Sequence, residues 1–461
     1  FDSLAHQNEL SWNTLIHGYI KCDMPHHALT LFHDLYRDDS LHLLNEHSFV
    51  DLLRTCAKMK DLKGGLSIHI RVASMGFLET NPFIGSSLVD MYGKCYSLSK
   101  AEQVFIKIPF HDAVTWTALI EAYVQNDSNE EALTCFEKMR IEGIFPNVIT
   151  YGCTLKACAN IGLKALDKAK FIHAEIERIG VLKTNLMLGN ALVNMYAKMG
   201  GLNLAQEVLG QLPIQDVVSM TSLIAGYVEN GYDDEALDCF QKMQIEGLIP
   251  DAVTLVCCLK ACGNIGAITK GIELHNDIEE AGLLKNVCIG IALVEMYAKY
   301  GLLEKARAVF DQLPNKNVIA WNTLMSGLWN NQEAMLGCFD EMQQEGICPD
   351  AVTYVFVLKA CGDIGFLEKG SKIHREIDKK GWLEKETTIG NTLIDMYAKL
   401  GCIKQASEVL EKHQKRDLVS WNALISGYAQ LGEATHAIVL FQIKYNNRCI
   451  TPVLDLVPIY G

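Results

Sequence analysis

The sequence predicts an all-α protein, a right-handed α-solenoid of about thirteen helix-turn-helix repeats. The first observation is repetition, because the phrase MYxK recurs about every hundred residues, at 91–94, 195–198, 296–299 and 396–399. The second is that each of these periods divides into three similar repeats, one of them opened by phrases such as WNTLI or WTALI. A repeat of 31 to 38 residues is too small to bury its own apolar face. Stability must therefore come from the stacking of neighbouring repeats.

Within one repeat, apolar residues follow a helical spacing twice. The first stripe consists of Trp116, Leu119, Ile120 and Tyr123, and the second of Ala132, Leu133, Phe136 and Met139. Positions i, i+3, i+4 and i+7 lie on one face of a helix. Glycine follows the second stripe and proline comes three residues later, which ends the helix and redirects the chain. Each repeat is thus predicted to be a helical hairpin.

Composition predicts one continuous array. The chain has 461 residues, 49% of them hydrophobic, and shows neither the alternation of a sheet nor a Gly/Ser linker. We therefore expect a single solenoid over 9–453, preceded at 1–8 by the end of a truncated repeat and followed at 454–461 by a divergent tail. No uncharged apolar run reaches the roughly 18 residues that a membrane span needs, so no membrane association is predicted.

Charge and cysteine content exclude several functions. A formal charge of -14 argues against charge-driven coating of nucleic acids, but less against recognition of bases by neutral side chains. The sixteen cysteines fall mostly at equivalent helix positions and include no CxxC pair, so they are predicted to be reduced core thiols. The tripeptides that begin at His173 and His374 match the HxE of zinc deaminases only superficially. We expect no metal, no cofactor and no enzymatic activity.

The repeated phrases resemble the pentatricopeptide repeat proteins of plant organelles, in the form that alternates P, L and S repeats. WNTLI openings that close on EGIxPD are similar to P repeats, LKAC with a central IH to L repeats, and IGNxLIDMYAK to S repeats. Tetratricopeptide repeats lack these phrases. P repeats are assigned to 9–45, 113–147, 217–251, 318–350 and 418–453, L repeats to 46–81, 148–185, 252–286 and 351–386, and S repeats to 82–112, 186–216, 287–317 and 387–417.

The resemblance implies that the fifth and the last residue of each P or S repeat recognise one RNA base. Chemistry supports the last position, since uracil and guanine present a ring N–H that suits an Asp acceptor, and adenine and cytosine a bare nitrogen that suits an Asn donor. The resemblance alone assigns Thr or Ser at the fifth position to purines and Asn to pyrimidines. The residues concerned are Asn13 with Asn45, Ser86 with Asp112, Thr117 with Asn147, Asn190 with Asp216, Thr221 with Asp251, Asn322 with Asp350, Asn391 with Asp417, and Asn422.

These pairs predict the target 5′-YNGANUGNNUNUY-3′ in parallel orientation. Ile291 with Asn317 departs from the pattern, and the fifth residues of the L repeats, Val50, Gly152, Val256 and Val355, cannot discriminate a base edge by hydrogen bonds. Asn and Asp at the last position also suit helix N-caps. Capping alone does not predict that Asn, Thr or Ser occupies the fifth position in P and S repeats and in no L repeat. The sequence leaves open whether the shortened repeat 318–350 keeps its register.

Two further sets of residues have alternative roles. In the family, lysines at the end of the MYxK phrase approach phosphate, and the alternative is a solvated lysine; these are Lys94, Lys198, Lys299 and Lys399. The second residues of P repeats either sandwich bases or pack the first helix; these are Val114, Val218, Ile319 and Val419.

The resemblance implies a monomeric protein of the mitochondrion or chloroplast that binds single-stranded RNA. It also implies a role in C-to-U editing, with a deaminase and small editing cofactor proteins recruited in trans, or alternatively in splicing or protection of RNA ends. The repeat pattern decays after Phe441, so the C-terminal extension and deaminase domain of the family are expected to be missing. The alternatives are a protein-binding helical scaffold, favoured by the acidic charge, and a truncated fragment without a function.

Overall fold

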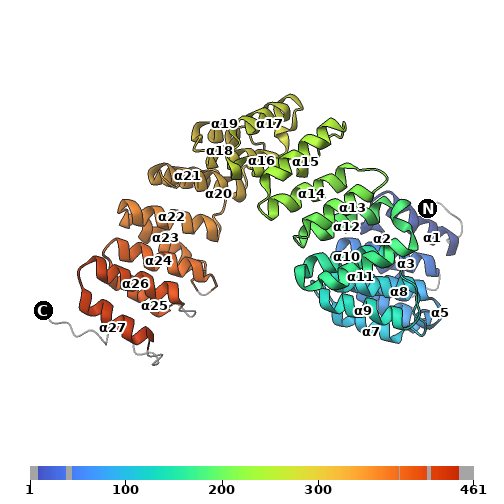
Figure 1. Ribbon diagram of the computed structural model, residues 1–461. Coiled ribbons are helices and arrows are strands. Elements are labelled where there is room, and N and C mark those ends of the chain that lie inside the picture. Colours follow the sequence, from blue (N-terminus) through green and yellow to red (C-terminus); the bar gives the residue numbers. More distant parts are fainter. Residues whose placement is uncertain (1–8, 38–43, 384, 413–416, 446–461) are drawn as a thin grey trace. The chain divides into compact units, whose positions relative to one another are not determined.

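The computed structural model describes residues 9–37, 44–383, 385–412 and 417–445. Over these ranges the regular secondary structure is helical, and the chain forms two compact units, unit 1 at 1–250 and unit 2 at 251–461 (Figure 1). The described helices form thirteen consecutive pairs, which confirms the predicted all-helical repeat fold. The truncated repeat at 1–8, the last part of the final P repeat and the tail at 454–461 lie outside the described residues.

The first helix of every pair begins at the first residue of a predicted repeat. In unit 1 these first helices are α1 (Glu9–Lys21), α3 (Glu46–Met59), α6 (Pro82–Lys94), α8 (Ala113–Gln125), α10 (Val148–Ile161), α12 (Leu186–Lys198) and α14 (Val217–Glu229). In unit 2 they are α16 (Ala252–Ile265), α18 (Val287–Lys299), α20 (Val318–Gly327), α22 (Ala351–Ile364), α24 (Thr387–Lys399) and α26 (Leu418–Gln430).

The second helices follow after short turns. In unit 1 they are α2 (Pro25–Arg37), α4 (Leu62–Ser74), α7 (Leu98–Lys107), α9 (Asn129–Ile141), α11 (Leu166–Ile179), α13 (Leu202–Gln211) and α15 (Asp233–Ile245). In unit 2 they are α17 (Ile268–Glu280), α19 (Leu303–Asp311), α21 (Gln332–Gln344), α23 (Leu367–Lys379), α25 (Ile403–Lys412) and α27 (Ala434–Tyr445). Four short helices lie in L repeats: α5 (Phe77–Thr80), η2 (Gly162–Ala165), η3 (Val181–Lys183) and η4 (Leu283–Lys285).

The core forms where these helices stack. Trp116, Leu119 and Ile120 of the first stripe are buried, and so is the whole second stripe. Tyr123 is half-buried, and its hydroxyl donates to Glu102 at 2.7 Å. The predicted core thiols at one repeat position are all buried, at Cys56, Cys158, Cys262 and Cys361. Within each unit, successive first helices pack against one another and form a continuous layer.

The first helices of S and P repeats approach each other through a contact between small residues. A Cβ added at Gly226 of α14 would lie 2.5 Å from the Cβ of Ala197 on α12 and 3.0 Å from its Cα. The same close approach joins Gly93 to Ala122, Gly327 to Ala298 and Gly427 to Ala398. Because backbone atoms line the contact, a larger side chain would force the two helices apart.

L and S repeats are joined by a different contact, between a histidine of the L repeat and the tyrosine of the MYxK phrase. His69 Nδ1 lies 2.7 Å from the Tyr92 hydroxyl, and the pair His275 and Tyr297 has the same distance. The two tripeptides that resemble HxE provide the other examples, His173 with Tyr196 at 3.1 Å and His374 with Tyr397 at 3.0 Å. Burial lowers the pKa of all four histidines. These histidines therefore join each L repeat to the S repeat that follows it, through the tyrosine hydroxyl.

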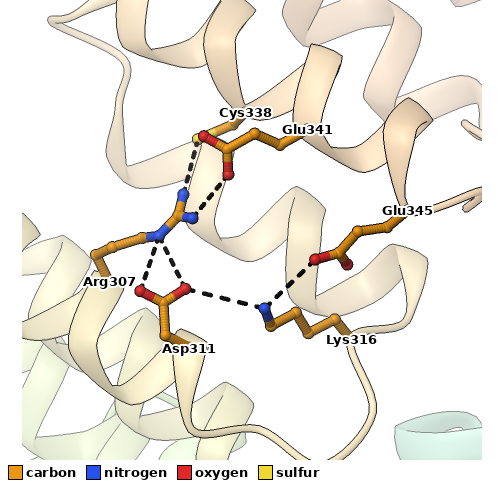
Figure 2. Close-up of polar contacts among 6 residues, drawn as sticks. All are labelled: Arg307, Asp311, Lys316, Cys338, Glu341 and Glu345. Carbon is orange, nitrogen blue, oxygen red and sulfur yellow. Dashed lines mark hydrogen bonds and ion pairs between the residues drawn. The ribbon is translucent and has the colours of Figure 1, made fainter.

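An ionic network in unit 2 joins α19, the second helix of repeat 287–317, to α21, the second helix of the shortened repeat 318–350 (Figure 2). Arg307 of α19 donates to Glu341 of α21 at 2.7 Å and to Asp311 at 3.0 Å, and Lys316 lies 3.5 Å from Glu345. These groups are partly exposed, so each pair contributes only about 0–1 kcal/mol by itself. The network nevertheless joins α21 and its C-terminal end to the preceding repeat at two points, through Arg307 on α19 and through Lys316 in the loop that follows α19.

None of the helices in the described part of the chain is long and apolar enough to cross a membrane.

Candidate functional site

The fifth residue of each repeat lies on the first helix, and the side chain of the last residue caps the first helix of the following repeat at every described junction except Glu386, which makes no such bond to α24. For example, the Asp112 side chain accepts the Thr115 N–H at 2.8 Å and caps α8, and Asn147 caps α10 through Thr150 at 2.9 Å. Stacking of the first helices places a repeat's fifth residue beside its own last residue within the same compact unit. The two predicted base-recognition positions therefore meet at each junction between stacked first helices.

Three predicted pairs make direct hydrogen bonds between their two side chains, across 26 to 28 residues of sequence. Asn190 Nδ2 donates to Asp216 Oδ2 at 2.9 Å, Asn322 Nδ2 to Asp350 Oδ1 at 3.0 Å, and Asn391 Nδ2 to Asp417 Oδ2 at 3.0 Å. All three are Asn and Asp combinations, for which the sequence predicts uracil. Repeat 318–350 makes the same contact as the others, so its shortening does not separate its fifth and last residues.

A Ser or Thr residue of the following first helix lies at each of these three sites. Thr353 donates to the Asn322 side-chain oxygen at 2.7 Å, and Ser420 donates to that of Asn391 at 2.5 Å. In the third site Ser219 instead bonds Asp216, and the oxygen of Asn190 is buried without a hydrogen-bond partner among the described residues. A carboxylate accepts about four hydrogen bonds, so each Asp retains capacity after capping the helix and binding the Asn.

The sites with a hydroxyl at the fifth position are arranged differently. The Thr117 hydroxyl contacts the Thr150 hydroxyl at 2.6 Å, and the Ser86 hydroxyl donates to the Phe83 carbonyl at 3.1 Å. Both side chains are only 6% exposed, whereas the three asparagines paired with Asp are half-buried.

The remaining predicted residues have the following positions. Asn13 is buried on α1, where its side-chain oxygen accepts from the Asn45 N–H at 3.1 Å and also from Ser48. Thr221 is buried on α14 of unit 1. Asp251 caps α16 of unit 2 and accepts the Thr254 N–H at 2.8 Å. Asn422 is exposed on α26, and the end of its repeat lies outside the described residues.

Hydrogen bonds keep the carboxylates of the three Asn and Asp pairs ionised. Burial raises the pKa of Asp216 and Asp350, but bonds from Ser219 or Thr353 and from the paired asparagine outweigh burial, and the net pKa is lowered. For Asp417 the bond from Ser420 is the largest effect, and the pKa is lowered as well. The carboxylates are thus hydrogen-bond acceptors at neutral pH, as recognition of a ring N–H requires.

We expect these carboxylates to make the free energy of unfolding depend on pH only under acid conditions. Their folded pKa values lie below the ordinary value of 3.8, so their contribution is fully present above that value and is lost as the pH falls through the lowered pKa. Urea unfolding should give the same contribution between about pH 5 and 8 and a decline below about pH 4. Asp350→Asn keeps a capping residue without a titrating group and should reduce the acid decline. An unchanged decline in this variant would contradict the assignment.

Capping explains the last position in L repeats too, because Asn81, Asn185 and Asn286 all cap the following first helix. The identity of the last residue is therefore not by itself evidence for base recognition. The difference lies at the fifth position, where L repeats carry Val50, Gly152, Val256 and Val355 and offer no polar group to the cap. The direct contact between Asn and Asp is a property of P and S repeats alone among the described residues.

Three of the four predicted phosphate-binding lysines are held by acids. Lys94 lies 2.8 Å from Asp90, Lys299 3.0 Å from Glu295, and Lys399 2.8 Å from Asp363. Lys198 is exposed, and the structure gives it no hydrogen bond or ion pair within the described ranges. Its partner position one helical turn earlier holds Asn194 instead of an acid. A phosphate would therefore compete with a carboxylate at three of these four lysines.

The second residues of the repeats form an exposed apolar row. Val114, Val218, Ile319 and Val419 are 46–59% exposed, so packing of the first helix does not account for them. The same position is exposed in the first P repeat, at Leu10, and in L and S repeats, where no such role was predicted. The L and S residues are Phe83, Ile149, Met187, Val253 and Val352. The spacing from each helix start would have revealed them, because the second residue of a capped helix is regularly exposed at this junction.

The HxE tripeptides have structural partners. Glu175 lies 3.5 Å from Arg140, and Glu376 accepts from the Tyr354 hydroxyl at 2.7 Å. Within the described residues, no group of three or more His, Cys, Asp or Glu side chains is placed to hold a metal ion.

Comparison with known proteins identifies the family. A PPR repeat family model matches residues 111–160, 215–264 and 316–363, and a PPR repeat model matches 10–39, 292–318, 391–417 and 419–443. The chain is 34% identical over 443 residues to a chloroplastic pentatricopeptide repeat-containing protein of Arabidopsis thaliana, covering 95% of this chain and 70% of that protein. The chain belongs to the pentatricopeptide repeat family. Membership of this repeat family agrees with the prediction that the array is not an enzyme.

Other relatives are longer than this chain. A mitochondrial pentatricopeptide repeat-containing protein of Arabidopsis thaliana is 36% identical over 91% of the chain, which covers 41% of that protein. A second chloroplastic relative is 31% identical over 97% of the chain, which covers 51% of it. The fold is similar to the crystal structure of the maize pentatricopeptide repeat protein PPR10, with a TM-score of 0.55, 16% identity, and coverage of 98% of this chain and 76% of PPR10. PPR10 in complex with an 18-nt psaJ RNA element has a TM-score of 0.50.

Proposed function

We propose that this chain binds single-stranded RNA and recognises one base with each P or S repeat. The observation that carries the proposal is the direct hydrogen bond between fifth and last residues in three separate repeats. Each of these sites presents an ionised carboxylate beside an amide, and the helix that the Asp caps carries an exposed valine two positions after it, at Val218, Val352 or Val419. Such a site offers a hydrogen-bond acceptor to a base edge and an apolar surface to its face. The complex of PPR10 with RNA supports the same function.

The alternation of P, L and S repeats is part of the proposal. L repeats differ from the others in their apolar fifth residue, in their histidine contact to the next repeat, and in the short helices α5, η2, η3 and η4. This periodic difference supports assignment to the P-L-S class. With that class we propose a role in C-to-U editing of an organellar transcript, in the mitochondrion or chloroplast. The array would specify the site, and a deaminase and small editing cofactor proteins would act in trans.

Binding to the predicted target tests the proposal. The purified chain should bind labelled 5′-YNGANUGNNUNUY-3′ RNA in fluorescence anisotropy and should bind more weakly when the A opposite repeat 113–147 is replaced by U. Each well-placed hydrogen bond that is lost costs about 1–3 kcal/mol, or roughly 5- to 150-fold in affinity. An RNA changed only opposite an L repeat is the matched control. Failure to bind either RNA at low salt would favour a protein-binding scaffold or an inactive fragment.

A further inference from the structure

The L repeats carry a basic residue at their ninth position. These four residues are Arg54, Lys156, Lys260 and Lys359. Each follows the fifth residue of its repeat by four positions on the same first helix, for example Arg54 after Val50 on α3. Residues at i and i+4 lie on one face of a helix, one turn apart. The four cations therefore lie on the same face as the fifth residues, in the repeats whose fifth residue cannot recognise a base.

These cations differ from the S-repeat lysines in their partners. The ninth residues of three S repeats are the acids Asp90, Glu295 and Asp395, and each pairs with the lysine one turn later. The structure gives the four L-repeat cations no hydrogen bond or ion pair within the described ranges. The first three are exposed, and the fourth, Lys359, is half-buried with its ammonium 5.1 Å from the Trp329 ring centre.

Lys156 also lies at a cavity of about 500 Å³ in unit 1. The cavity is lined by four lysines and one aspartate, Lys58, Lys60, Lys94, Lys156 and Asp127. The first three lysines already bind other groups, namely Asp23, the Tyr96 hydroxyl and Asp90. Asp23 and Asp90 neutralise two of these lysines, so Lys60 and Lys156 against Asp127 leave the lining with one net positive charge, and Lys156 has its ammonium donors available to bind an anion.

We infer that the L repeats bind the RNA backbone, with Arg54, Lys156, Lys260 and Lys359 contacting phosphate groups. The inference rests on the proposed function and assigns a role in RNA binding to repeats whose fifth residues cannot discriminate a base edge by hydrogen bonds. Phosphate contacts position a nucleic acid without specifying its sequence. P and S repeats would specify bases, and each L repeat would hold the strand between them. Cations without an acidic partner on the first helices of the L repeats, two in each unit, would also give a chain with a net charge of -14 local positive charge that attracts RNA.

The salt dependence of RNA affinity tests this inference. The combined variant Arg54→Gln, Lys156→Gln, Lys260→Gln and Lys359→Gln should bind the target RNA with a shallower plot of log K against log salt. Each phosphate contact to a single strand contributes about 0.7 to that slope, so four contacts should reduce it by about 3. Discrimination between A and U opposite repeat 113–147 should stay unchanged, since the base-recognition residues are intact. Circular dichroism would establish that the variant remains helical.

A control variant removes the same charge elsewhere in the same repeats. Lys63, Lys170, Lys270 and Lys372 are exposed residues of the second helices of the four L repeats. Their combined replacement by Gln should leave the slope within about one contact, or about 0.7, of the unaltered chain. Equal slopes for both variants would overturn the inference while leaving RNA binding intact. If the unaltered chain fails to bind RNA, the proposed function fails, and the inference with it.

Discussion

Exchanging two side chains in one repeat, Thr117→Asn together with Asn147→Asp, is expected to change the base preferred by that repeat from A to U. The chain itself contains the structure of the altered site. In repeat 318–350, Asn322 donates to Asp350 at 3.0 Å and accepts from Thr353. Thr150 corresponds to Thr353, because each lies three positions after the last residue of the repeat concerned, on the first helix of the next repeat. Thr150 already bonds the Asn147 side chain at 3.1 Å. The new Asn and Asp should therefore adopt the same arrangement.

The altered repeat should also fold. Asn and Asp are equally good N-cap residues, so α10 keeps its cap. An ionised Asp presents only acceptors to the base, and leaving the ring nitrogen of adenine without a donor costs about 1–3 kcal/mol. The unaltered chain should thus prefer the RNA with A by roughly 10-fold, and the double variant should prefer the RNA with U by a similar factor.

Fluorescence anisotropy of both proteins with both RNAs measures this reversal. A base change opposite the neighbouring L repeat 148–185 is the control and should alter neither protein's affinity, because Gly152 offers no side chain to the base. If the folded double variant keeps the original order of preference, the assignment of Thr117 and Asn147 to base recognition is wrong.

The local parts of this fold could be predicted from the sequence. The helix starts followed from capping residues and the apolar spacing, because both are set by contacts within about four residues along the chain. The contacts that build the candidate site could not be derived in this way. Asn190 and Asp216 are separated by 26 residues, and their hydrogen bond depends on how α12 stacks on α14. Sequence spacing places two residues on a face, but the distance between faces is a property of packing.

The partners of the lysines in the MYxK phrases could also be predicted only in part from the sequence. Lys94 and Lys198 occupy equivalent positions in the MYxK phrase, yet only Lys94 is paired with an acid, because its partner Asp90 is replaced by Asn194 in the other repeat. Lys399 binds both Asp395 in its own helix and Asp363 in the preceding repeat. The first partner is visible in the sequence at i-4, but the second depends on stacking. A lysine at a given repeat position can therefore be predicted to be free for a ligand only when two residues are known, the one at i-4 and the one that it contacts in the adjacent repeat.

Gly226→Leu is expected to cause the largest loss of stability among these changes. A Cβ at this position would lie 2.5 Å from the Cβ of Ala197 and 3.0 Å from its Cα. The Cα belongs to the backbone of α12 and cannot rotate away. Overpacking of a tight contact costs about 1–3 kcal/mol, and the value should lie near the upper end because a whole helix must move. Urea unfolding followed by circular dichroism would measure the loss. Gly152→Ala is the matched control, since its added Cβ would meet nothing within 4 Å and should stabilise α10 by about 0.5–1 kcal/mol.

The same substitution links packing to recognition. Asp216 caps α14 and Asn190 lies on α12, so moving these helices apart breaks the 2.9 Å hydrogen bond between the two side chains. In the folded variant, preference for U opposite repeat 186–216 should weaken, whereas preference opposite repeat 387–417 should persist, because stability in a repeat array depends on neighbouring contacts. Equal loss at both positions would show that the array responds as a whole. Unchanged preference at the first position would separate base recognition from the Asn190 and Asp216 contact.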